Sequence, residues 1–153
     1  MSGNARAFRT HELPEATELR VGTYVDGDGA CVSDGTATLD VCALRAAVAS
    51  RPTSDRAILD AGSKTPTSDR AAGCEPNSMG LLVEYPEARV ARLYKEHAVV
   101  ELRDATGEPD VGDDVTLIPN HACEVVHLEN HMEAHRGGVS IGTWAIGPRG
   151  RRR

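Results

Sequence analysis

The sequence has few aromatic residues, no long apolar run and no apolar segment near its start. Aromatic residues make up 3% of the 153-residue chain, so stacking platforms for single-stranded nucleic acid are missing. The formal net charge of -6 also disfavours binding to a polyanion. No run is long enough to cross a membrane, and residues 1–15 do not resemble a secretory signal. We therefore expect a cytoplasmic protein that binds neither nucleic acid nor membranes.

Several motifs that carry common chemistry are also missing. The four cysteines, at positions 31, 42, 74 and 123, form no C-x-x-C pair, so we expect reduced thiols and not a disulfide framework. The sequence contains no HExxH motif, no glycine-rich phosphate loop and no G-x-S-x-G elbow. These absences argue against zinc-protease, nucleotide-binding and serine-hydrolase readings.

Short apolar or β-branched runs recur along the chain from residue 21 onward, and the chain contains 15 glycines and 8 prolines that separate such runs. Such punctuation is typical of an all-β sandwich or barrel. The runs at 88–94 and 98–102 flank a short break, which predicts a hairpin. We expect a flexible leader at 1–17, one β-domain at 18–147 and a basic tail at 148–153. The remaining candidate strands lie at 21–25, 56–59, 80–84, 115–118, 123–128 and 139–146.

Residues 38–50, TLDVCALRAAVAS, are ambiguous. Their alanine content and the i, i+3, i+4 spacing of Leu44, Ala47 and Val48 fit an amphipathic helix. A strand fits the punctuation on either side of the segment. Local residues alone leave both interpretations open.

The pattern His121-Ala122-Cys123 is the most distinctive local feature. Imidazole and thiolate both bind zinc, and a one-residue gap lets two side chains of an extended strand point the same way. On spacing alone, a surface histidine beside a buried cysteine is the simpler interpretation, because two ligands do not close a zinc site. Glu96 and His97 are weaker acid/base candidates in a predicted polar turn. Lys64, in Asp60-Ala61-Gly62-Ser63-Lys64, fits a turn better than a Schiff-base lysine.

A set of segments spans most of the chain after residue 17: ELRVGTYV (18–25), residues 40–44, SRP (50–52), AILDAGSK (57–64), residues 80–86, KEH (95–97), VGD (111–113), IPNHACEVVHL (118–128), RGG (136–138) and Thr143-Trp144. Their order and spacing resemble the D-serine dehydratase/D-threonine aldolase family. Members of that family have an alanine racemase-like architecture, with a pyridoxal-phosphate-binding (β/α)8 barrel followed by a β-rich C-terminal domain. The resemblance implies that this chain is the C-terminal β-domain without its barrel, and that residues 38–50 form a strand.

The same resemblance implies a metal-assisted lyase. His121 and Cys123 match the family pair that binds zinc, or another divalent metal, beside the cofactor. Cys123 favours the dehydratase type, which eliminates D-serine to pyruvate and ammonia, since aldolase members tend to carry aspartate there. Lys64 does not match the cofactor lysine, so pyridoxal phosphate is expected only through the missing barrel.

Three interpretations of the isolated chain stay open. It is half of a split enzyme with a separate barrel subunit, a non-catalytic metal-binding or interaction domain, or a gene fragment. The first requires the D-amino-acid substrate to bind in the complete enzyme. A missing barrel also predicts an exposed apolar surface, and hence self-association or partner binding.

Overall fold

The computed structural model describes residues 11, 12, 14, 15, 17, 18, 22–66, 78–102 and 107–147. Within these residues the fold is mainly β, as the sequence predicts, and it also contains two short α-helices. No helix in this part of the chain is long and apolar enough to cross a membrane. The elements are η2 (Thr23–Val25), α1 (Gly29–Ser33), β1 (Leu44–Thr53), β2 (Arg56–Leu59), β3 (Leu81–Leu82), β4 (Arg89–Leu93), β5 (Ala98–Glu101), β6 (Asp114–Ile118), α2 (Ala122–Leu128), β7 (His131–Arg136) and β8 (Val139–Ala145).

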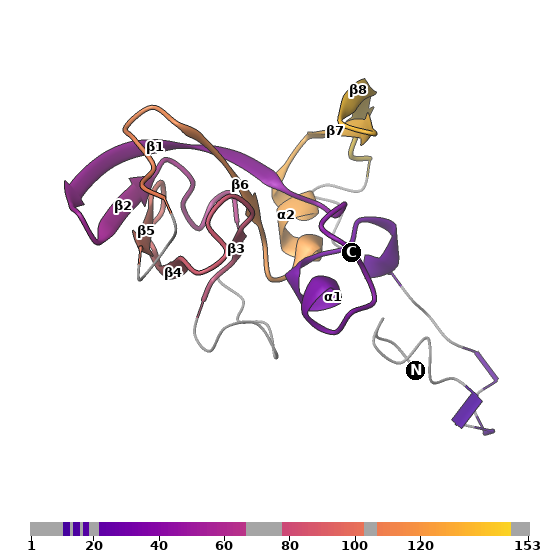
Figure 1. Cartoon of the computed structure of the whole chain (residues 1–153). Helices are drawn as coiled ribbons and strands as arrows, with labels where there is room; N and C mark the ends of the chain where they lie inside the picture. The colour runs from indigo at the N-terminus through magenta and orange to yellow at the C-terminus, as the bar shows by residue number, and fades with distance from the viewer. Residues whose placement is uncertain are drawn as a thin grey trace.

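Six strands form one antiparallel sheet in the order β3-β6-β1-β2-β5-β4. The two edges of this sheet approach each other, because the backbone N–H of Met79, just before β3, donates to the carbonyl of Val90 on β4 at 2.9 Å. The sheet therefore curls into a nearly closed barrel (Figure 1).

The interior of the barrel is filled by small and branched apolar side chains. Val90, Ala98 and Val100 are fully buried, and their strand neighbours are more exposed. This alternation follows from the period of two along a strand. Removal of apolar surface from water is the main favourable contribution to folding here.

Strand β1 links the two halves of the barrel. Its first residues pair with β6, from Leu44 opposite Leu117 to Ala47 opposite Asp114. Its later residues pair with β2, with an irregularity between Val48 and Ser50. The strand predicted at 38–50 is thus confirmed from residue 44 onward, whereas residues 38–43 are irregular. Pairing on both sides overrides the helix propensity of the alanines.

The predicted hairpin is confirmed as β4–β5, with Leu93 opposite Ala98. The strand expected at the end of the domain is present as β8.

Two other expected strands are wrong. Residues 23–25 form the 3-10 helix η2, and residues 123–128 belong to helix α2. In α2, the i, i+3 pair Ala122 and Val125 is buried on one face. The alternation at 123–128 was weak, so helical burial of this pair prevails over strand pairing.

The β7–β8 hairpin forms a second, two-stranded sheet and stands away from the barrel (Figure 1). Every residue of β8 is exposed, including Val139, Ile141 and Trp144. A lone two-stranded sheet has marginal stability in water. The predicted basic tail at 148–153 lies outside the described residues, and the predicted leader at 1–17 lies largely outside them.

Candidate metal site

The two predicted metal ligands lie where β6 gives way to α2. His121 is the N-cap of α2, with extended backbone angles of φ -142 and ψ 119, and Cys123 lies in the first helical turn. The expectation that both residues share an extended strand is therefore wrong. Their relative direction is set by a strand-to-helix junction, since only His121 keeps strand geometry.

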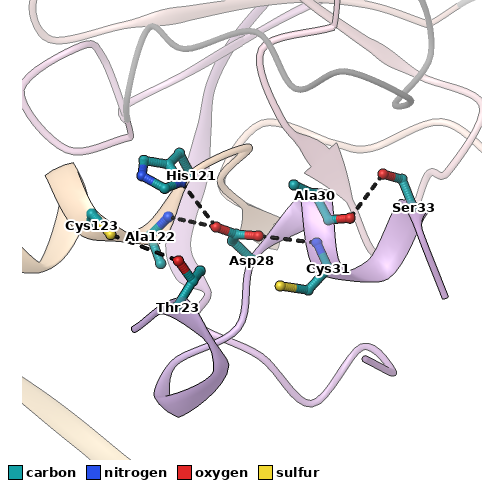
Figure 2. Close-up of polar contacts among 8 residues, drawn as sticks. All are labelled: Thr23, Asp28, Ala30, Cys31, Ser33, His121, Ala122 and Cys123. Atoms are coloured by element: carbon teal, nitrogen blue, oxygen red, sulfur yellow. Dashed lines mark hydrogen bonds and ion pairs between the residues drawn. The ribbon is translucent and has the colours of Figure 1, made fainter. Parts of the chain in front are cut away.

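A buried carboxylate that the sequence analysis missed organises this junction. Asp28, whose residue is 1% exposed, lies just before α1. Its Oδ1 accepts a hydrogen bond from the backbone N–H of Cys31 at 3.1 Å. Its Oδ2 accepts from the backbone N–H of Ala122 at 3.2 Å and lies 3.2 Å from Nδ1 of His121 (Figure 2).

The segment around Asp28 is tied to the junction by its backbone as well. The N–H of Gly29 donates to the carbonyl of Pro119 at 2.8 Å. A Cβ at position 29 would lie 3.1 Å from that carbonyl oxygen, so glycine permits the close approach. In the sequence, Asp28 stands in Asp26-Gly27-Asp28-Gly29, a pattern that is typical of a turn.

The contact with Asp28 leaves the other nitrogen of His121 available. An ionised carboxylate can only accept, so it favours the tautomer with hydrogen on Nδ1. Nε2 then carries a lone pair. The ring is half-buried, and Figure 2 shows its second nitrogen on the side away from Asp28. This arrangement fits a metal ligand, since metal-bound histidines usually donate through their other nitrogen to a carboxylate or carbonyl.

Cys123 is the most accessible thiol among the described cysteines. It is exposed, and its Sγ lies 3.9 Å from Oγ1 of Thr23 in η2. Cys31 is buried. Burial, followed by the negative charges of Asp26 and Asp28, raises the pKa of Cys42 to about 11, which disfavours the thiolate that binds metals. Cys74 lies outside the described residues.

The donor set fits a soft or borderline divalent metal in an open site. Nitrogen and sulfur ligands suit zinc. Within the described ranges, no group of three or more His, Cys, Asp and Glu side chains could hold a metal ion. His121 and Cys123 would thus leave coordination positions to water, substrate or a residue from another polypeptide.

Glu96 and His97 lie elsewhere, in the exposed β4–β5 turn. This turn packs against the segment after β2. The backbone N–H of Ser63 donates to the Tyr94 carbonyl at 2.6 Å, and Lys64 forms an exposed ion pair with Glu96. These contacts join residues 60–64 to the turn at 95–97. They give Glu96 and His97 a structural role at the surface and do not place them in a cleft.

The chain does not fit pyridoxal phosphate by itself. Lys64 and Lys95 are its lysines, and both are exposed in loops. A lysine that forms a Schiff base needs a desolvated or otherwise activated setting. Lys64 instead pairs with Glu96 in water.

Comparison with known proteins identifies the family of this chain. Residues 42–134 match the family model described as "Putative serine dehydratase domain". The chain belongs to this family. It is 35% identical over 96 residues to an uncharacterized protein of Mycobacterium tuberculosis, which covers 63% of this chain and 71% of that protein. It is 33% identical over 138 residues to D-threonine aldolase of Arthrobacter sp, which covers 88% of this chain and 35% of the aldolase.

Several solved structures share the fold of this chain. D-threonine aldolase from Filomicrobium marinum superposes with a TM-score of 0.74 at 22% identity, over 97% of this chain and 39% of that one. D-threo-3-hydroxyaspartate dehydratase from Delftia sp. HT23 superposes with a TM-score of 0.70 at 25% identity, over 88% of this chain and 40% of the dehydratase. An alanine racemase-like protein from Idiomarina loihiensis superposes with a TM-score of 0.71 at 20% identity, over 87% of this chain and 39% of that protein. The chain therefore spans about two fifths of these solved proteins.

The docking of the β4–β5 turn gives a stability prediction. A Cβ at Gly62 would lie 2.4 Å from three backbone atoms of residues 95–97. We expect Gly62→Ala to lower the free energy of unfolding by about 1–3 kcal/mol, because the turn must shift. Gly22→Ala is the matched control, since a Cβ there meets nothing within 4 Å. Urea unfolding measures both, and equal stability of the two variants would contradict the described contact.

Proposed function

We propose that this chain is the metal-binding C-terminal β-domain of a pyridoxal-phosphate-dependent D-amino-acid lyase of the D-serine dehydratase type. The observation that carries the proposal is the strand-to-helix junction where His121 meets the buried Asp28 and Cys123 is exposed. Membership of the serine dehydratase-domain family supports the same assignment.

The names of two solved relatives support the choice of metal ligands. One is an H-to-A variant of D-threo-3-hydroxyaspartate dehydratase. Another is a C-to-A variant of such a dehydratase in the metal-free form. The numbers in those names place the two replaced residues two positions apart, which is the spacing of His121 and Cys123 in this chain.

In this proposal the chemistry divides between this domain and a cofactor-binding barrel. When bound, zinc supplies a Lewis acid for a substrate hydroxyl, and pyridoxal phosphate supplies an electron sink. In this chain, Nε2 of His121 and Sγ of Cys123 would hold the metal. Asp28 would keep Nδ1 of His121 directed away from it.

A D-threonine aldolase-type reaction is the second candidate. The identity of 33% to the Arthrobacter aldolase favours it. We rank it below the dehydratase type because the resemblance implies an aspartate at the Cys123 position in aldolases. A thiolate is a softer ligand than a carboxylate and favours zinc over harder cations.

The β7–β8 hairpin supports a docking role for this domain. It exposes Val139, Ile141 and Trp144 on a strand without charged side chains. The related solved enzymes are more than twice as long as the matched region. We propose that a cofactor-binding barrel covers this hairpin in the complete enzyme. Self-association of the lone chain and a non-catalytic interaction domain are the alternatives.

Zinc binding tests the ligand assignment. We expect the purified chain to bind zinc weakly, because two protein ligands leave the site open. Cys123→Ala should abolish this binding, whereas Cys31→Ala, which replaces a thiol in another segment, should retain it. Competition with a chromophoric chelator measures the affinity. Equal zinc uptake by the wild type and Cys123→Ala would rule the assignment out.

Reconstitution tests the division of labour. The lone chain with pyridoxal phosphate, zinc and D-serine should form no pyruvate, because both of its lysines are exposed in loops and neither is set up to bind the cofactor. A mixture with a barrel protein encoded beside this chain should form pyruvate, and Cys123→Ala in that mixture should remove the activity. Trp144→Ser should weaken association with the barrel without changing zinc uptake. Pyruvate from the lone chain would contradict catalytic incompleteness, and none from the mixture would leave the interaction-domain and gene-fragment alternatives.

A further inference from the structure

The carboxylate of Asp28 has three hydrogen-bonding neighbours. Both of its oxygens are engaged, Oδ1 by the N–H of Cys31 and Oδ2 by the N–H of Ala122. The second oxygen also lies 3.2 Å from Nδ1 of His121, which is 93 positions further along the chain. Figure 2 shows these contacts converging on Asp28 from α1 on one side and from the start of α2 on the other.

The contacts of Asp28 cap the two helices and also fix the orientation of the His121 ring. The backbone donors hold the carboxylate in one orientation, and that orientation places an acceptor against one edge of the imidazole. Because the acceptor selects hydrogen on Nδ1, the lone pair of the neutral ring lies on Nε2. Ring direction and tautomer are therefore both set by a residue that could not itself reach a metal held at Nε2.

We propose that Asp28 is the positioning residue of the metal site, which prepares His121 as an Nε2 ligand before any metal binds. This inference rests on the proposed function for the role of the metal. Its structural part, the tautomer of His121, stands without it. Partners of this kind typically change metal affinity by about 10- to 100-fold when they are replaced.

An amide cannot reproduce the role of the carboxylate. In Asp28→Asn, oxygen on the Cys31 side would direct the amide NH2 toward the N–H of Ala122 and toward Nδ1 of His121. That donor favours hydrogen on Nε2, which blocks the metal-binding nitrogen. The opposite orientation would restore the acceptor for His121 but would lose the cap of α1, so both orientations break one part of the arrangement.

A matched control is available close by. Asp34 follows α1, is exposed, and its carboxylate accepts hydrogen bonds from the backbone and hydroxyl of Thr36. Asp34→Asn removes the same charge at the other end of the same short helix without touching His121. It therefore separates a local electrostatic effect on zinc affinity from the contact that we describe.

The experiment has two readouts on the full chain. The first is the tautomer of His121 in the metal-free protein, from long-range proton–nitrogen correlation at about pH 8, well above the ordinary pKa of imidazole. We expect hydrogen on Nδ1 in the wild type and in Asp34→Asn, and a shift toward hydrogen on Nε2 in Asp28→Asn. The second is zinc affinity, which should fall about 10- to 100-fold in Asp28→Asn alone.

The outcomes separate the inference from the proposed function. Nδ1 protonation without zinc binding in the wild type would overturn the metal site but retain the positioning of His121. Zinc binding with the same tautomer and affinity in Asp28→Asn would overturn the inference and leave the metal site standing. If Asp28→Asn fails to fold, the wild-type tautomer still decides, because hydrogen on Nε2 there contradicts the proposal.

Discussion

The candidate site depends on one buried carboxylate. A buried negative charge is costly unless donors surround it, and Asp28 meets this requirement with two backbone N–H groups and an imidazole. Without it, helix α1 would lose its N-cap, and α2 would lose a partner for an N–H of its first turn. The same contact determines how His121 lies, so the order of the junction and the metal binding that we propose for it have a common cause.

The barrel supplies the rigid support on which this contact acts. Leu117 and Ile118, at the end of β6, are fully buried and hold the start of the junction. The next turn is fixed by Asn120, whose side-chain amide donates to the carbonyl of Ser78 at 2.8 Å. Ser78 lies beside the Met79–Val90 contact that closes the sheet. Closure of the barrel and placement of His121 are therefore linked through neighbouring residues.

Local sequence patterns predicted much of the barrel and little of the site geometry. The β4–β5 hairpin was predictable because its strands lie close in sequence and end at polar residues. The first part of β1 was not predictable from local residues, since the alanines of residues 38–50 favour helix until β6 and β2 pair with this strand. Helix α2 was mistaken for a strand because its burial depends on Val125 and on contacts from the distant α1 segment.

The proposed metal ligands and the carboxylate that positions His121 also differ in how far the sequence predicts them. His121 and Cys123 were proposed from residue chemistry and from the resemblance to a family, both of which are visible in neighbouring residues. Asp28 could not be proposed in this way, because 93 positions separate it from His121. No local pattern predicts a contact of that length. Glu96 and His97 show the opposite case. They were proposed as an acid/base pair from residue chemistry, but they lie in an exposed turn that packs against Gly62.

The central claim is an open metal site with one imidazole and one thiolate from this chain. Zinc-edge X-ray absorption of the zinc-loaded chain tests it most directly, because it counts sulfur and imidazole neighbours separately. The account predicts a single sulfur at about 2.3 Å and a single imidazole nitrogen at about 2.0 Å, with light oxygen atoms completing the shell. A shell without sulfur, or one with two or more sulfurs, would contradict it.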